Sequence, residues 1–144
     1  MAQTARITLE NGNAIEVEFY PQDAPKTVEN FVKLAKQGFY DGLKFHRVVP
    51  DFVVQGGCPK GDGTGGPGWT IPAEFNSKKH VRGTVAMARS QHPDSAGSQF
   101  YICYGPTPHL DRNYTVFGQV TSGMEHVDRI KQGDKMKSVE IQES

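Results

Sequence analysis

The feature that most limits the fold is a succession of short apolar runs, separated by turn-forming residues, along most of the chain. Residues 5–9 and 14–20 flank Asn11-Gly12, and Asn-Gly is a strong signal for a β-hairpin because both turn positions accept positive φ. Six further strand-like runs follow, at residues 44–49, 52–55, 84–88, 99–103, 115–120 and 137–142. Eight short strands favour a β-sandwich or a closed β-barrel.

Two other segments show the periodicity of an amphipathic helix. Residues 25–37 begin with Pro25, which suits a first helical position, and are followed by Gly38, which suits the position after a helix. The apolar residues of this segment recur at near-helical spacing: Val28, Phe31, Val32, Leu34 and Ala35. A second helix is predicted over residues 123–130, with Gly133 ending it. We therefore expect two helices packed over the open ends of the strand layer.

Length and charge narrow the class of protein. A chain of 144 residues is the size of one ordinary domain, so we expect a single domain over residues 1–144. The 16 basic and 16 acidic residues cancel, which removes the electrostatic basis for binding nucleic acid or an anionic membrane. The longest apolar stretches, such as residues 85–88, are far shorter than the ~20 residues of a spanning helix. There is no apolar signal region, and 2 cysteines cannot form a disulfide framework, so we expect a cytoplasmic location.

Glycine is concentrated in one segment of the chain. Seven of the thirteen residues from 56 to 68 are glycine, and residues 61–66 satisfy the G-x-G-x-x-G pattern of a nucleotide-binding loop. That pattern needs a helix directly after it, and residues 67–72, with two prolines and a glycine, are unsuited to begin one. Nucleotide binding is therefore the weakest alternative. A surface loop with several positive-φ turns, or one that another backbone approaches closely, is favoured.

Patterns for metal, redox or hydrolase chemistry are missing from the sequence. The 5 histidines include no H-x-x-x-H pair, and Cys58 and Cys103 do not form C-x-x-C. The segment Gly97-Ser98-Gln99 also differs from the G-x-S-x-G turn of hydrolases. We therefore predict no metal site.

A more specific signal comes from a set of blocks spread over nearly the whole chain. The blocks are F-H-R-V-V-P-D-F-V-V-Q-G-G (45–57), G-T-G-G (63–66), A-M-A (86–88), G-S-Q-F-Y-I (97–102), H-L-D (109–111) and V-F-G-Q-V (116–120). In this order and spacing they resemble the cyclophilin family of peptidyl-prolyl cis–trans isomerases, and the short length is similar to that of compact prokaryote-type members. The resemblance implies a mainly β fold, an eight-stranded antiparallel β-barrel capped by two α-helices, and no cofactor.

The resemblance also implies an enzyme that accelerates rotation about Xaa–Pro bonds during folding, acting on proline-containing peptides and unfolded proteins. Rotation breaks no covalent bond, so such an enzyme needs only to bind the twisted amide better than either planar form. The twisted nitrogen regains a lone pair, and Arg47 is a permanent cation that can donate to it. Gln55 would hold the substrate backbone or fix Arg47, and Phe52 completes the predicted catalytic set.

The same resemblance assigns a substrate groove. An apolar slot for the proline ring would be formed by Phe52, Val53, Tyr101 and Leu110. An extended peptide would pair with the backbone near Ala88, Arg89 and Ser90. The remaining predicted substrate-binding residues are Gln99 beneath the peptide, Gly63 at the rim, His109 and Tyr114.

Several groove positions depart from the usual family pattern. Tyr101 and Val53 stand where many members have Phe and Met, and Tyr101 adds a hydroxyl at the proline slot. Tyr114 stands where much-studied eukaryotic members have His, and Arg89 replaces an Asn and brings a charge beside the groove. His109 replaces a Trp that is linked to tight cyclosporin binding, so we expect cyclosporin to bind only weakly.

Other interpretations of these residues stay open from the sequence alone. Arg47 could belong to a surface ion pair, and Gln55 could satisfy loop backbone. Phe52, Tyr101 and Leu110 could be ordinary core residues. At the level of function, the alternative to an isomerase is a non-catalytic binding module or chaperone that holds proline peptides in the same groove.

Strand geometry adds two expectations. On a regular strand His46 points to the opposite face from Arg47, which favours a structural role for this histidine. Phe52 and Gln55 are three residues apart, so they can line one groove only if the chain bends near Phe52, after Pro50-Asp51.

Overall fold

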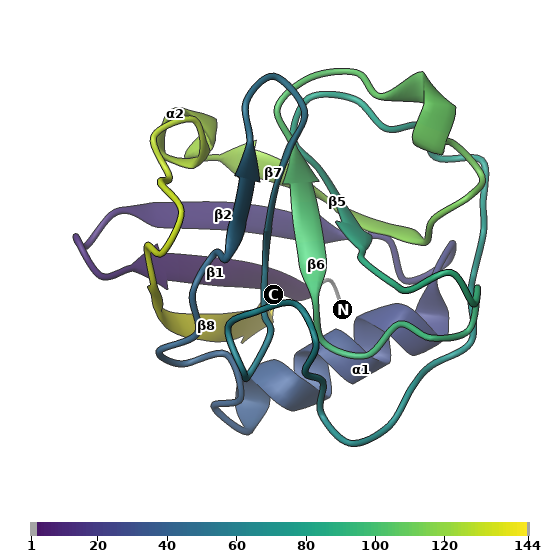
Figure 1. Ribbon diagram of the computed structural model, residues 1–144, viewed down its shortest axis with the longest axis horizontal. Helices are drawn as coiled ribbons and strands as arrows, with labels where there is room; N and C mark the ends of the chain where they lie inside the picture. The colour runs from purple at the N-terminus through teal and green to yellow at the C-terminus, as the bar shows by residue number, and fades with distance from the viewer. Residues whose placement is uncertain (1–2, 144) are drawn as a thin grey trace.

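A computed structural model describes residues 3–143, in which eight antiparallel strands form one sheet (Figure 1). The strands are β1 (Gln3–Leu9), β2 (Ala14–Phe19), β3 (Arg47–Val49), β4 (Val53–Gly56), β5 (Thr84–Met87), β6 (Phe100–Cys103), β7 (Val116–Ser122) and β8 (Met136–Glu143). Their order across the sheet is β3-β4-β6-β5-β7-β2-β1-β8. The predicted hairpin is β1–β2, in which Ile7 lies opposite Ile15 and Gly12 has a φ of 90°.

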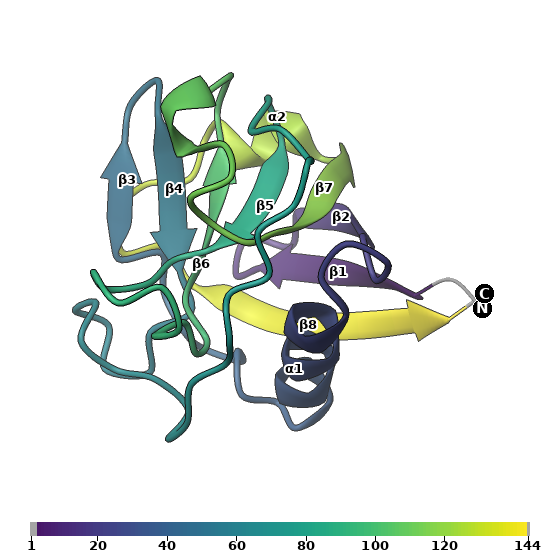
Figure 2. The ribbon, with the colours of Figure 1, turned by 90° about the vertical axis from the view of Figure 1, so that its right-hand side faces the viewer.

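The sheet is curled into a half-barrel whose edge strands meet through the segments that precede them. Residues 42–45, which precede β3, pair with residues 133–136, which lead into β8, through four backbone hydrogen bonds of 2.8–2.9 Å. At its other end, β8 lies beside the start of β1, with Gln3 opposite Glu143 (Figure 2). The mainly β architecture of eight antiparallel strands with two helices is therefore confirmed.

Helix α1 (Pro25–Lys36) covers the interior of the curled sheet. Its buried Phe31 packs against four aromatic rings, those of Phe19, Tyr40, Phe100 and Phe117, with centroids 4.9–5.6 Å away. Lys33 and Lys36 lie in the last turn, where basic side chains interact favourably with the helix dipole. The helix predicted at residues 25–37 is thus present, and its apolar face supplies part of the main core.

The second helix is shorter than predicted. Helix α2 (Met124–Val127) is a single turn, whereas the sequence pattern extends to residue 130. The N–H groups of Arg129 and Ile130 bond to carbonyls three residues back, so the chain continues as tighter turns after Val127. Val127 and Ile130 are nevertheless buried, as the periodicity requires. Within residues 3–143, neither helix has the length and apolar character needed to cross a bilayer.

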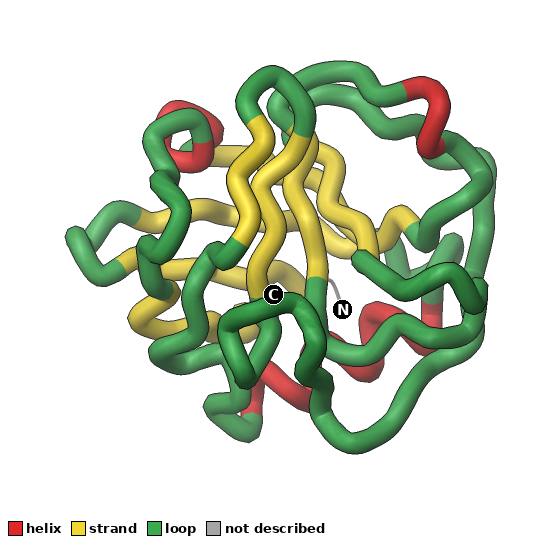
Figure 3. Tube along the Cα trace, in the orientation of Figure 1, coloured by secondary structure: helices red, strands yellow, loops and turns green. Residues whose placement is uncertain are grey.

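The central strands bury apolar residues on both faces, which decides where a site can form. Val54, Phe100 and Ile102 point into the curled sheet and belong to the main core. The alternating positions of β4, β5, β6 and β7 form a second, smaller core on the outer face: Val53, Ala86, Tyr101, Cys103 and Val116. The long connections after β4 and after β5 run over the surface beside this outer face (Figure 3).

Candidate functional site

A row of directly opposed residues crosses three neighbouring strands on the outer face. Arg47 of β3 lies opposite Gln55 of β4, and Gln55 lies opposite Tyr101 of β6. Directly opposed side chains project from the same face of a sheet, so these three point to one place. Within residues 3–143 no carboxylate lies within ion-pair distance of the exposed Arg47. The alternative of a surface ion pair for Arg47 is therefore wrong.

The connection between β3 and β4 brings Phe52 to the same face. Strand β4 begins at Val53, and the N–H of Phe52 donates to the carbonyl of Val49 (3.1 Å) across a turn. Pro50 takes the second position of this turn, and Asp51 takes the third with a φ of 61°, as a type II turn requires. The predicted bend after Pro50-Asp51 is confirmed, and it lets Phe52 and Gln55 share one groove.

These residues enclose a cavity of about 200 Å³, called the proline pocket below. Its lining residues are Arg47, Phe52, Val53, Gln55, Ala88, Arg89, Tyr101, Leu110 and Tyr114. Most of the wall is apolar or aromatic, and the two charged lining residues are both arginines. The pocket can therefore hold a small apolar ring beside a cation. Nine of the thirteen predicted site residues converge here.

His109 does not line the proline pocket, nor the second pocket described in the next paragraph. Its ring stacks on that of Phe52 at a centroid distance of 5.6 Å and an interplanar angle of 21°. It lies on the short 3₁₀ helix Pro108–Leu110, which the sequence did not predict and which brings Leu110 to the pocket. His109 thus supports Phe52 from outside the pocket.

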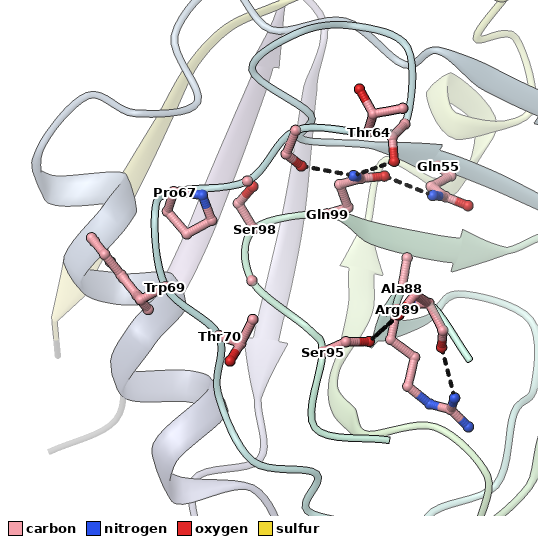
Figure 4. Close-up of a pocket in the computed structure, with 15 residues that line it drawn as sticks. Gln55, Thr64, Pro67, Trp69, Thr70, Ala88, Arg89, Ser95, Ser98 and Gln99 are labelled. Carbon is pink, nitrogen blue, oxygen red and sulfur yellow. Dashed lines mark hydrogen bonds between the residues drawn. The ribbon is translucent and has the colours of Figure 1, made fainter. Parts of the chain in front are cut away.

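A second cavity of about 350 Å³, called the glycine-loop pocket below, adjoins the first (Figure 4). The two share Gln55, Ala88 and Arg89, so they form one continuous groove. The predicted residues Gly63, Ser90 and Gln99 lie here, as do nine residues that were not among the predicted site residues: Thr64, Gly65, Gly66, Pro67, Trp69, Thr70, Ser95, Gly97 and Ser98. The glycine-rich run therefore forms a wall of the groove.

Side-chain hydrogen bonds connect the two pockets. Arg47 Nη1 donates to Gln55 Oε1 (3.4 Å), and Gln55 Nε2 donates to Gln99 Oε1 (3.0 Å). Gln99 Nε2 in turn donates to the carbonyls of Gly63 (3.0 Å) and Gly65 (2.9 Å). Both amide orientations are fixed, because Arg47 can only donate and backbone carbonyls can only accept. The series fixes the Arg47 side chain relative to the glycine-rich wall. Figure 4 shows the part of it from Gln55 through Gln99 to the glycine carbonyls.

Arg89 contributes the second cation of the groove. Its guanidinium donates to the carbonyls of Ser90 (2.9 Å), Gln91 (3.3 Å) and Asn113 (2.6 Å), and it lies 4.6 Å from the ring centroid of Tyr114. These contacts orient the guanidinium but leave its charge unneutralised. The backbone N–H and C=O of Arg89 have no backbone partner among residues 3–143, because strand β5 has already ended at Met87.

The Tyr101 hydroxyl does not enter the proline pocket, in contrast to the expectation from the sequence. It lies 2.8 Å from Nε2 of the buried His80, whose Nδ1 is 3.0 Å from Asp111 Oδ1. Burial raises the pKa of Tyr101 and lowers the pKa of His80. The hydrogen bond from the His80 backbone lowers the pKa of Asp111. Tyr101 therefore presents its ring to the pocket. No motif in the sequence marks His80, so no role was predicted for it.

His46 lies just before β3, outside the regular strand on which its orientation was predicted. A Cβ atom on Gly63 would approach its Nε2 to 3.4 Å, so its imidazole contacts the glycine-rich run. Burial lowers the pKa of His46. It lines neither pocket, and this position is consistent with a structural role.

Comparisons with known proteins point to one family. Residues 4–144 match the family model described as cyclophilin type peptidyl-prolyl cis-trans isomerase/CLD. Peptidyl-prolyl cis-trans isomerase B of Bacillus subtilis is 54% identical over 142 residues, which cover 97% of this chain and 99% of the relative. A peptidyl-prolyl cis-trans isomerase of Helicobacter pylori is 51% identical over 144 residues, covering 96% and 88% of the two chains.

Among solved structures, a cyclophilin-type isomerase of Cryptosporidium parvum superposes with a TM-score of 0.90 at 30% identity, covering 100% of this chain and 99% of that one. A second crystal structure of that protein, obtained in the presence of the dipeptide Ala-Pro, gives a TM-score of 0.89 at 28% identity. It covers 98% of this chain and 99% of that one.

Proposed function

The chain belongs to the cyclophilin family of peptidyl-prolyl cis–trans isomerases and is an enzyme of that class, and from this premise we propose how its own residues perform the reaction. The proposal assigns Arg47, Gln55 and Phe52 to catalysis. It assigns the remaining groove residues to substrate binding: Val53, Gly63, Ala88, Arg89, Ser90, Gln99, Tyr101, His109, Leu110 and Tyr114.

Arg47 is the group that stabilises the transition state. An Xaa–Pro bond rotates over a barrier of about 18–20 kcal/mol, because rotation breaks amide resonance. Acceleration from ~0.01 s⁻¹ to ~10³ s⁻¹ requires about 7 kcal/mol of differential binding. The twisted proline nitrogen carries a lone pair that the planar amide lacks, so a donor aimed at it favours the transition state alone. The unpaired guanidinium of Arg47 lines the proline pocket and supplies such a donor.

Gln55 holds Arg47 in position for this interaction. The 3.4 Å contact between them is long, as catalytic hydrogen bonds often are before substrate binds. Gln55 is itself fixed by Gln99, so its amide oxygen faces the guanidinium without reorganisation. This preorganisation lowers the cost of bringing the guanidinium onto the amide nitrogen during the reaction.

The groove binds the substrate as an extended peptide. The proline ring enters the apolar pocket between Phe52 and Tyr101, and residues before it extend over Ala88 and Arg89 into the glycine-loop pocket. The unpaired backbone of Arg89 provides main-chain hydrogen bonds for such a peptide. The relative crystallised in the presence of Ala-Pro supports a proline peptide as the ligand.

The proposed substrates are exposed Xaa–Pro segments of unfolded proteins, so the enzyme acts in folding, with chaperone-like holding as a secondary effect. Cyclosporin is proposed to bind only weakly, because His109 stacks flat against Phe52 and replaces a larger indole. A cytoplasmic location is supported by the two cysteines, Cys58 and Cys103, which are both buried and free.

The observation that carries the mechanism is an arginine that lines an apolar pocket and has no carboxylate partner among residues 3–143. It is tested by NMR exchange of a short Xaa–Pro peptide with the wild type and with Arg47→Ala. We expect rapid exchange with the wild type and a large loss with the variant. A binding module would instead bind the peptide without accelerating its isomerisation, and full activity of Arg47→Ala would contradict the electrostatic mechanism.

A further inference from the structure

A buried histidine behind the proline pocket, His80, makes four hydrogen bonds that the roles assigned above do not use. Its side chain has 0% of its surface exposed. Its backbone N–H donates to Asp111 Oδ1 (2.7 Å), and its carbonyl accepts from the N–H of Thr107 (3.1 Å). Its ring nitrogens lie 3.0 Å from Asp111 Oδ1 and 2.8 Å from the Tyr101 hydroxyl. His80 is therefore bonded to two separate segments of the chain.

Each of those two segments supplies part of the wall of the proline pocket. Tyr101 lies on β6, and Leu110 lies on the 3₁₀ helix that Thr107 and Asp111 bracket. The hydrogen bonds of His80 to Thr107 and Asp111 hold both ends of this helix. Because the same histidine also bonds to Tyr101, it fixes the separation of the two walls.

The hydrogen-bond partners also decide where the protons lie. The Asp111 carboxylate can only accept, so His80 Nδ1 carries a hydrogen and donates to it. Burial lowers the pKa of His80, so the ring is neutral and Nε2 keeps its lone pair. The Tyr101 hydroxyl must therefore donate to Nε2. Its only proton is directed away from the substrate.

We propose that His80 is a positioning residue for the isomerase reaction. It holds Tyr101 and Leu110 at a separation that fits a proline ring, and it keeps the Tyr101 wall free of a hydrogen-bond donor. The inference rests on the proposed function, because the pocket it shapes is the one assigned to proline. A pocket wall contacts the proline ring in the planar and the twisted forms alike, so its loss weakens both states and raises KM more than it lowers kcat.

Two substitutions of His80 separate its two ring contacts. His80→Asn keeps an amide donor near the position of Nδ1, toward Asp111, but offers no acceptor to Tyr101. His80→Gln extends an amide oxygen toward Tyr101 and restores that acceptor. Tyr101→Phe removes the hydroxyl and keeps the ring, so it tests whether the two His80 variants differ only through this contact. His126→Asn, on α2 and outside both pockets, is the matched control.

Steady-state isomerisation of an Xaa–Pro peptide gives the decisive comparison. We expect His80→Asn to raise KM about three- to tenfold, through an unsatisfied buried hydroxyl, with kcat changed by less than about twofold. His80→Gln should recover most of the KM. In a Tyr101→Phe background the Asn and Gln variants should have KM values within about twofold of each other. His126→Asn should match the wild type.

Equal effects of His80→Asn with and without the Tyr101 hydroxyl would overturn the proposal, as would an unchanged KM in a folded His80→Asn protein. If His80→Asn does not fold, ¹⁵N NMR of the wild-type imidazole decides. A protonated Nδ1 with an unprotonated Nε2 supports the proposal, and a protonated Nε2 contradicts it. A wild type that binds the peptide but does not accelerate exchange would refute the proposed function instead, whatever tautomer His80 adopts.

Discussion

Arg47 and Gln55 lie directly opposite each other on β3 and β4, and the Arg47 guanidinium donates to the Gln55 amide oxygen across 3.4 Å. The Gln55 amide nitrogen also donates to Gln99. Gln99 in turn donates to the carbonyls of Gly63 and Gly65 in the glycine-rich wall. The cation at the proline pocket is thus held by a series of hydrogen bonds that reaches a loop on the far side of the groove. Catalysis and peptide binding should therefore be coupled in this protein.

Removing the guanidinium should damage turnover more than binding. We expect Arg47→Ala to lower kcat about 10²- to 10³-fold, the usual effect of losing one preorganised donor to a transition state. Arg47→Lys retains a charge but loses the planar fork and the contact with Gln55, so it should recover only part of this loss. NMR exchange spectroscopy of the cis–trans interconversion of a proline peptide measures the rate with each variant.

A matched control for this experiment is Arg112→Ala, because Arg112 is exposed and lies outside both pockets. It should retain wild-type kcat and KM. A comparable loss of activity in Arg112→Ala would mean that the effect of Arg47→Ala reflects net charge and not the position of the guanidinium.

Gln99→Ala should uncouple the glycine-rich wall from the catalytic arginine. The carbonyls of Gly63 and Gly65 lose their shared donor, and Gln55 loses the acceptor that fixes its amide. We expect faster amide hydrogen exchange in residues 61–66 and a fall in kcat/KM of about tenfold, the cost of one or two partly buried hydrogen bonds. Hydrogen exchange unchanged from the wild type in this loop would contradict the coupling.

The sequence predicted the fold and most of the groove because the relevant signals are local. Asn11-Gly12 specifies the first hairpin, and the block from Phe45 to Gly57 places Arg47, Phe52 and Gln55 on adjoining segments. Even the bend near Phe52 follows from the parity of a strand, and Asp51 supplies it with a φ of 61°.

Features that depend on distant partners could not be predicted from local patterns. His80 has no motif around it, and its role depends on Tyr101 and Asp111, which are 21 and 31 residues away in the chain. For the same reason Tyr101 was expected to bring its hydroxyl into the pocket, although that hydroxyl is bonded behind it. The 3₁₀ helix Pro108–Leu110 is too short to show periodicity.

Peptide charge should affect binding through Arg89. The charged residues lining the two pockets are Arg47 and Arg89, and neither has a carboxylate partner among residues 3–143. Peptides with Glu before the Xaa–Pro pair should therefore have a KM about two- to fivefold lower than peptides with Lys there, the range of partly exposed charge pairs. Arg89→Gln should reduce this ratio, and 0.5 M salt should reduce it as well. An unchanged ratio in Arg89→Gln would exclude Arg89 as its source.

Stability should fall in mild acid because of two histidines, the buried His80 and the partly buried His46. Burial lowers the pKa of both His80 and His46 in the folded state, so below about pH 6.5 the unfolded chain binds protons that the folded protein does not. The contribution of these two histidines to the free energy of unfolding is fully present above that pH and is lost as the pH falls toward their lowered pKa values. The lowered pKa of Asp111 adds a further loss of stability in stronger acid. Urea unfolding midpoints should be constant from pH 7 to 8 and decrease from about pH 6.5 to 5.

His80→Asn should make this decrease shallower, and His92→Asn, at an exposed position, should leave it unchanged. Because neither His80 nor His46 is expected to exchange a proton with the substrate, kcat/KM should stay nearly flat from about pH 6 to 8 while the protein remains folded. A bell-shaped profile in that range would instead give a histidine a direct role.

Inhibition by cyclosporin should depend on the residue stacked against Phe52. His109 stacks on the Phe52 ring with centroids 5.6 Å apart, and its imidazole is smaller than the indole that other members of the family have there. His109→Trp places an indole there, which keeps a ring N–H donor and offers more apolar contact to a bulky cyclic ligand. We expect inhibition to strengthen by about tenfold or more, since burying roughly 60 Å² of additional apolar surface contributes about 1.5 kcal/mol. Peptide isomerisation without inhibitor should change little in KM. His109→Phe, which enlarges the apolar ring but removes the N–H donor, separates the two contributions. Equal inhibition of the wild type and His109→Trp would show that this position does not limit cyclosporin binding.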